Sequence, residues 1–328
     1  FLLGSMYMAV GEIERAVEAW EAVRRVRPNL PVLHRNLGLA LLHGLDDVAK
    51  AAAVMEEGLA HDPKNLALYL GLDQALSLQG VPPATRVRAL ERYPADSRPP
   101  ELVIALAMAL TEAGRFDEAE GLFRNRFFPR EELGTNVRQV YMQVRVRRAR
   151  DAAASGRCAD ALAIIDRLTD PVPGVSFTSD GMEPFARQTR MEYEVGRIAK
   201  TCGDADRATR HLKAAASRRG GSPLDLAFAH RAAAVLGEAG ALRPRLEQAL
   251  EDARRRAEAA GTNMPGTLAL GRGLLLVELG RPEEARAHFL QTLRLPDRYL
   301  AHHLARTELA ALGAASAQRG RTVAPAVQ

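Results

Sequence analysis

A ten-residue pattern recurs along the chain and limits what it can fold into. The copies are GEIERAVEAW, GRFDEAEGLF, GRCADALAII, GDADRATRHL and GRPEEARAHF, which begin at residues 11, 114, 156, 203 and 280. Each copy has an alanine five residues after its glycine and a bulky apolar residue four positions further on. The glycines are separated by near multiples of a unit of roughly 34–40 residues, which is typical of a repeat solenoid.

The pattern predicts a helix–turn–helix hairpin in each repeat. Its glycine ends one helix, because glycine adopts the left-handed conformation at the least cost. The alanine lets two helices cross closely, and the bulky residue one turn later on the same face fills the core. A further small residue often stands seven positions before the glycine. The signature residues are Gly4, Gly11, Ala16, Trp20, Gly38, Ala51, Gly114, Ala119, Phe123, Gly156, Ala161, Gly196, Gly203, Ala208, Gly273, Gly280, Ala285 and Phe289.

This signature resembles the tetratricopeptide repeat. In the first unit, the residues at that repeat's spacing are Leu3, Gly4, Tyr7, Gly11, Ala16, Trp20 and Pro28. The resemblance implies an all-α, tetratricopeptide-type α-solenoid of about eight helical hairpins plus a capping helix. We expect the superhelix over residues 1–312, closed by a helix at 299–312, and a flexible C-terminal tail over 313–328. The first repeat is expected to be incomplete at its N-terminus, because its first helix should begin about four residues before Phe1.

A closer resemblance rests on residues 16–43, on YLGLDQAL at 69–76 and on RNRFFPRE at 124–131. These stretches are similar to the C-terminal repeat array of large bacterial proteins in which an uncharacterised β-sandwich region, similar to carbohydrate-active folds, comes first. The last stretch departs from that group, since Arg130 replaces an aromatic residue and Glu132-Leu133 replace glycines. The resemblance implies that this chain is a fragment and that the full-length protein could be an enzyme.

Composition and cysteine usage restrict the remaining possibilities. Aromatic residues make up only 5% of the chain, which favours helices, and the net charge of +5 permits an anionic partner without demanding one. Cys158 and Cys202 are expected to be free thiols in a reducing compartment, which places the protein in the cytoplasm. No apolar run reaches the roughly 18–20 residues of a membrane span, so no membrane association is expected. Two long interruptions, 127–136 and 169–185, are expected to be functional or mobile loops.

The sequence carries no catalytic motif, and neither a cofactor nor a metal site is predicted. The glycines at 271–273 lack the strand that a dinucleotide site needs. His302 and His303 are adjacent and point to different helix faces, unlike metal ligands at i and i+4. His34 is interpreted as a packed residue. The arginine clusters at 145–150 and 253–258 lack interleaved aromatic residues, so nucleic acid is not an expected partner.

A basic helix face is the remaining candidate site. In tetratricopeptide arrays the first helix of each hairpin lines the concave groove, and the spacing predicts groove-facing side chains on one face of the helix around Gly196. This face is either solvated surface or a clamp for a carboxylate. The tentative ligand-binding residues are Arg35, Arg150, Arg190, Tyr193, Arg197, Lys200 and His230.

The expected function is therefore a non-catalytic scaffold that binds a protein or acidic peptide. The partner is either a separate molecule or an upstream domain of the same polypeptide. Two alternatives remain open at this point. The array could be the non-catalytic part of a larger carbohydrate-active enzyme whose catalytic β-sandwich domain lies upstream, or it could be a structural oligomerisation scaffold.

Overall fold

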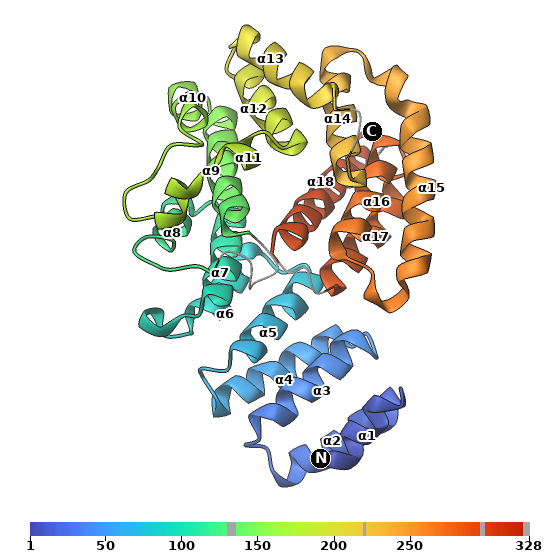
Figure 1. Ribbon diagram of the computed structural model, residues 1–328. Helices are drawn as coiled ribbons and strands as arrows, with labels where there is room; N and C mark the ends of the chain where they lie inside the picture. Colours follow the sequence, from blue (N-terminus) through green and yellow to red (C-terminus); the bar gives the residue numbers. More distant parts are fainter. Residues whose placement is uncertain (130–135, 219–220, 296–298, 324–328) are drawn as a thin grey trace, which may run out of the picture. The chain divides into compact units, whose positions relative to one another are not determined.

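The computed structural model describes residues 1–129, 136–218, 221–295 and 299–323, and it divides into two compact units, Phe1–Ala113 and Gly114–Gln328. Regular structure in these residues is helical (Figure 1). Within the same ranges the β-structure is one isolated bridge between Val172 and Val175. The superhelix expected over 1–312 stays a prediction.

The first unit consists of helical hairpins in chain order. Helices α1 and α2, α3 and α4, and α5 and α6 pack as pairs, and α7 packs against α5 and α6. Their bounds are α1 Leu2–Ala9, α2 Ile13–Val26, α3 Pro31–His43, α4 Val48–His61, α5 Leu66–Leu78, α6 Pro83–Glu91 and α7 Pro100–Glu112.

The second unit continues the same pattern. Its packed pairs are α9 with α10, α12 with α13, α14 with α15, and α16 with α17, and α18 closes the unit against α16 and α17. The bounds are α8 Phe116–Gly121, α9 Val137–Ala154, α10 Cys158–Asp166, α11 Glu183–Ala186, α12 Thr189–Thr201, α13 Ala205–Ala216, α14 Pro223–Leu236, α15 Arg243–Ala260, α16 Gly266–Glu278, α17 Pro282–Arg294 and α18 Leu300–Val323. The described residues thus hold seven packed helix pairs and a closing helix, close to the eight hairpins and capping helix that the repeat pattern predicted.

Glycine has two separate roles in these hairpins. At the turns it adopts a left-handed backbone, with φ of 82°, 76°, 77°, 79° and 78° at Gly11, Gly114, Gly156, Gly203 and Gly280. Inside the helices it permits close approach. A β-carbon at Gly196 would lie 2.7 Å from Leu212, and one at Gly273 would lie 2.5 Å from Phe289. In these two signatures the bulky residue therefore packs against the glycine of the preceding helix.

The two long interruptions are anchored to the second unit by aromatic residues. Phe128 and Phe177, one from each interruption, are buried against each other with ring centroids 5.8 Å apart. Both rings also pack on Phe123, and Phe177 packs on Tyr141 of α9. The described parts of both loops are thus fixed to the core. Residues 130–135, which include the departures at Arg130 and Glu132-Leu133, lie outside the described residues.

The closing helix is longer than the sequence suggested. It runs from Leu300 to Val323, past the boundary expected at residue 312. The flexible tail expected over 313–328 stays a prediction. None of the helices in the described ranges combines the length and the apolar character that crossing a membrane requires.

Candidate functional site

A pocket of about 260 Å³ lies between α9 and α12 in the second unit and includes three of the residues predicted to bind a ligand. Helix α12 supplies most of its wall, and the small side chains of Ala153 and Ala154 on α9 leave the space open. The lining residues are Arg150, Ala153, Ala154, Tyr193, Glu194, Arg197, Ile198 and Thr201.

The charges in this pocket are only partly compensated. Arg150 pairs with Glu194 across the pocket, with a nitrogen–oxygen distance of 3.5 Å. Arg197 and Lys200, by contrast, are exposed, and among the described residues neither forms an ion pair with a carboxylate. Arg197 donates to the hydroxyl of Tyr193 at 3.3 Å, and the Lys200 ammonium lies 3.4 Å from the carbonyl oxygen of Val235. Two cationic groups therefore remain available beside the pocket.

Tyr193 supplies an aromatic wall with a polar end. Burial raises the pKa of its hydroxyl, and the nearby Arg197 opposes this shift without cancelling it. The hydroxyl therefore keeps its proton at neutral pH and can donate a hydrogen bond to an acceptor in the pocket. The ring is held by Phe228 of α14, with centroids 5.5 Å apart, and the Arg197 guanidinium carbon lies 5.9 Å from the centre of the ring.

Arg190 does not lie on the exposed face that the helical spacing predicted. Its side chain is only 2% exposed and donates to Gln143 of α9. The side-chain nitrogen of Gln143 lies 3.1 Å from His303 of α18, so the closing helix reaches this end of α12. Burial lowers the pKa of Arg190 to about 10. The spacing argument considered only neighbouring repeats and could not include a helix more than a hundred residues later in the chain.

His230 and Arg35 lie elsewhere. His230 on α14 lies 2.8 Å from Glu278 of α16, which also pairs with Arg231. Arg231 in turn forms a bidentate ion pair with Glu308 of α18, with nitrogen–oxygen distances of 2.7 Å and 3.0 Å. Arg35 is exposed on α3 of the first unit and is not among the residues that line the pocket. The structure thus groups Arg150, Tyr193 and Arg197 at one pocket, with Lys200 one turn further along α12.

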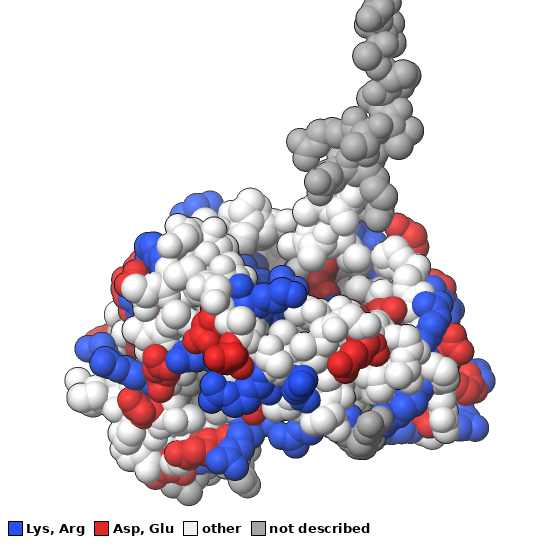
Figure 2. Space-filling model, turned by 90° about the horizontal axis from the view of Figure 1, so that it is seen from above, with Lys and Arg blue, Asp and Glu red and all other residues white. Residues whose placement is uncertain are grey.

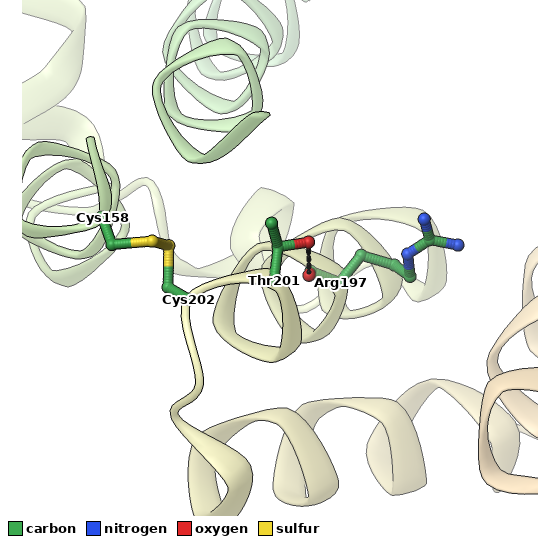
Figure 3. The surroundings of a disulfide bond; sticks show 4 residues. All are labelled: Cys158, Arg197, Thr201 and Cys202. Atoms are coloured by element: carbon green, nitrogen blue, oxygen red, sulfur yellow. Dashed lines mark hydrogen bonds between the residues drawn. A yellow bond between two sulfur atoms is a disulfide. The ribbon is translucent and has the colours of Figure 1, made fainter. Parts of the chain in front are cut away.

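The cysteine prediction was wrong. Cys158 and Cys202 form a disulfide, with α-carbons 5.2 Å apart, and they are separated by 44 residues in sequence (Figure 3). Cys158 opens α10 and Cys202 directly follows α12, so stacking of successive hairpins brings the two turns together. The sequence placed each cysteine at the turn of its own repeat but did not predict that these two turns lie together. Disulfides persist in oxidising compartments, so the cytoplasmic location loses its support from free thiols.

The disulfide joins the start of α10 to the end of α12, one of the two helices that form the pocket. Thr201, the last residue of α12, directly precedes Cys202, and its hydroxyl donates to the carbonyl oxygen of Arg197 at 3.0 Å. The Arg197 side chain extends away from the disulfide (Figure 3). The bond therefore fixes the C-terminal end of α12 against the α9–α10 hairpin and leaves the guanidinium free to contact a ligand.

Sequence comparison agrees with this architecture over the N-terminal part of the chain. Residues 1–71 of the 328 match the model of the tetratricopeptide repeat family. The fold is an all-α solenoid of the tetratricopeptide type. A search of curated protein sequences gave no match.

Several solved structures are similar to this solenoid at low sequence identity. YrrB, a tetratricopeptide repeat protein with an unusual peptide-binding site, is 14% identical, with a TM-score of 0.40 over 60% of this chain and 91% of YrrB. A tetratricopeptide repeat protein from Parabacteroides merdae is 14% identical, with a TM-score of 0.45 over 83% of this chain and 96% of its own. Human IFIT1 in complex with m7Gppp-AAAA is 14% identical, with a TM-score of 0.35 over 97% of this chain and 72% of IFIT1.

Proposed function

We propose that this solenoid is a binding scaffold that recognises an acidic segment of a protein at the α9–α12 pocket. The observation that carries the proposal is the pair of exposed cations, Arg197 and Lys200, which have no carboxylate partner among the described residues. These two cations also flank a pocket, and some other exposed arginines of the second unit are compensated. Arg254, for example, pairs with Glu251 and Glu258.

The charge near these groups is mixed, because Glu194 lines the same pocket. Figure 2 shows acidic and basic side chains interspersed over the face seen from above. A continuous basic surface would favour a polyanion such as nucleic acid. Two uncompensated cations beside a small pocket instead suit one or two carboxylates, because an arginine guanidinium can donate two parallel hydrogen bonds to a carboxylate.

The size of the pocket favours a side chain over a whole small molecule. Pockets for drug-sized ligands measure roughly 300–1,000 Å³, whereas this pocket measures about 260 Å³. An aspartate or glutamate side chain, or a C-terminal carboxylate, fits such a volume with its charge near Arg197 and its stem against Tyr193. The acidic segment can belong to a separate protein or to another part of the same polypeptide. Nothing in the described residues favours the carbohydrate-active context, and it forms no part of the proposal.

The test compares two charge reversals on one hairpin. Fluorescein-labelled peptides rich in Asp and Glu, and analogues with Asn and Gln instead, are titrated with the protein and followed by fluorescence anisotropy. Reversal of both Arg197 and Lys200 to Glu should weaken binding of the acidic peptides at least tenfold, about 1.4 kcal/mol. Binding to the unmodified protein should also weaken as salt is added, because exposed charges are screened.

The control is the reversal of Arg210 and Lys213 to Glu. These residues are exposed on α13, carry the same charge and have the same spacing as Arg197 and Lys200. This variant should bind like the unmodified protein. Equal weakening in both variants would mean that the peptides are attracted only by general charge. An unchanged affinity in the Arg197 and Lys200 variant would refute the site.

A further inference from the structure

Three potential metal ligands meet within the α3–α4 hairpin of the first unit. They are His34 on α3 and Glu57 and His61 on α4, and their ligand atoms all lie within 4.8 Å of one another. Glu57 and His61 are four residues apart, so they project from the same face of α4 on successive turns. The rings of His34 and His61 are stacked, with centroids 5.8 Å apart. No function derived above uses this cluster.

The buried member of the cluster has a free lone pair. His34 is fully buried, and its Nε2 lies 2.5 Å from the carbonyl oxygen of Pro28. A carbonyl only accepts hydrogen bonds, so Nε2 carries the proton and Nδ1 carries the lone pair. Nδ1 is buried and has no hydrogen-bond partner among the residues that the structure describes. Histidines that bind a metal commonly donate their other ring N–H to a backbone carbonyl in this way, which fixes the ring and its tautomer.

The carboxylate of Glu57 is held by a residue outside the cluster. Arg24 on α2 donates to one oxygen of Glu57 at 2.6 Å and leaves the second oxygen free. The same arginine pairs with Glu21 at 2.8 Å, which offsets its charge. Ligating carboxylates are typically held by such a second contact.

A glycine brings the two helices close enough for the cluster to form. A β-carbon at Gly58, next to Glu57, would lie only 2.6 Å from the β-carbon of His34. Any larger residue at this position would push α3 and α4 apart and separate His34 from the two residues on α4.

We propose that His34, Glu57 and His61 bind one zinc ion. Imidazole nitrogen and carboxylate oxygen are ordinary zinc ligands, and two histidines with one glutamate leave a fourth tetrahedral position for water or an anion. Tetrahedral ligand atoms at bond lengths of about 2.0–2.1 Å are roughly 3.3 Å apart, so the cluster must contract on binding. His61 is exposed and Glu57 partly exposed, and both can rotate towards the fixed ring of His34.

The sequence predicted no metal site for a definite reason. Glu57 and His61 have the i, i+4 spacing of ligands on one helix, but two ligands are too few to indicate a site. The third ligand comes from the preceding helix, at a position interpreted as packed. That interpretation accounts for the burial of His34 but not for its unpartnered nitrogen.

The test is a titration of the tag-free protein with Zn²⁺, followed by isothermal titration calorimetry. We expect one ion per chain. Exchange of His61 for Ala, or of Glu57 for Gln, should weaken binding at least tenfold. The control is His211→Ala, because His211 lies 2.6 Å from Glu192 but no third potential ligand joins them in the described part of the chain. This control should bind Zn²⁺ like the unmodified protein.

Two results would overturn the proposal. One is the absence of a one-to-one Zn²⁺ complex, and the other is an affinity that His61→Ala and Glu57→Gln leave unchanged. A second measurement needs no variant. Co²⁺ added to the unmodified protein should give the intense visible absorption bands of a four-coordinate site, and Zn²⁺ should abolish them. A spectrum identical to that of hydrated Co²⁺ would exclude the site.

Discussion

Reduction of the Cys158–Cys202 disulfide is expected to destabilise the second unit by about 4 kcal/mol. The bond closes a loop of 44 residues, and in the chain-entropy description a loop of this length restricts the unfolded chain by about 13 cal/mol/K. At 25 °C this entropy amounts to about 4 kcal/mol of stability. For a domain of 150–250 residues, a loss of that size lowers the melting temperature by roughly 8–16 °C.

The assay is a thermal melt followed by circular dichroism, with and without dithiothreitol. The double variant Cys158→Ala, Cys202→Ala should melt at the lower temperature in both conditions. Repeats in a solenoid are stabilised by their immediate neighbours, so reduction should raise hydrogen exchange in α10 and α12 more than in α16 and α17. The reasoning would be refuted if dithiothreitol left the melting temperature of the unmodified protein unchanged. It would also be refuted if dithiothreitol lowered the melting temperature of the double variant by the same amount.

Two further substitutions test the packing of each unit. Ala208 is 4% exposed on α13, which packs against α12. Its replacement by Leu should overpack this contact and lower the free energy of unfolding, measured in urea, by about 1–3 kcal/mol. Ala205→Leu, on the exposed side of α13, should cost little. Equal effects of the two substitutions would contradict the predicted repeat register. Arg86 on α6 is buried and binds Asp73 and Glu112 at 2.8 Å and 2.6 Å. Arg86→Met should cost about 3–5 kcal/mol because it removes a buried cation that binds two carboxylates. A loss of stability no larger than that of the exposed-site control Arg88→Met would refute this.

The fold was predictable because its signals are local. Gly11 and Gly203 end helices whatever their distant neighbours are, and both have the left-handed backbone that the pattern predicts. The close contact between Gly196 and Leu212 joins helices that are adjacent in the chain, so the repeat spacing predicts it.

The site was predictable only in part, because its remaining features depend on contacts between distant segments. Arg190 donates to Gln143, whose side-chain nitrogen lies 3.1 Å from His303 of α18, and the disulfide depends on how two hairpins stack. Tyr193 and Arg197 were found because a single helix carries both. Glu194, which compensates Arg150, was missed because the groove positions were assigned one helix at a time.

A structure of the complex between this protein and an acidic peptide selected by the anisotropy assay tests the central claim most directly. The account predicts a peptide carboxylate in the α9–α12 pocket, which accepts hydrogen bonds from the guanidinium of Arg197 and lies beside the ring of Tyr193. A peptide bound elsewhere, with Arg197 making no contact to it, would contradict the account.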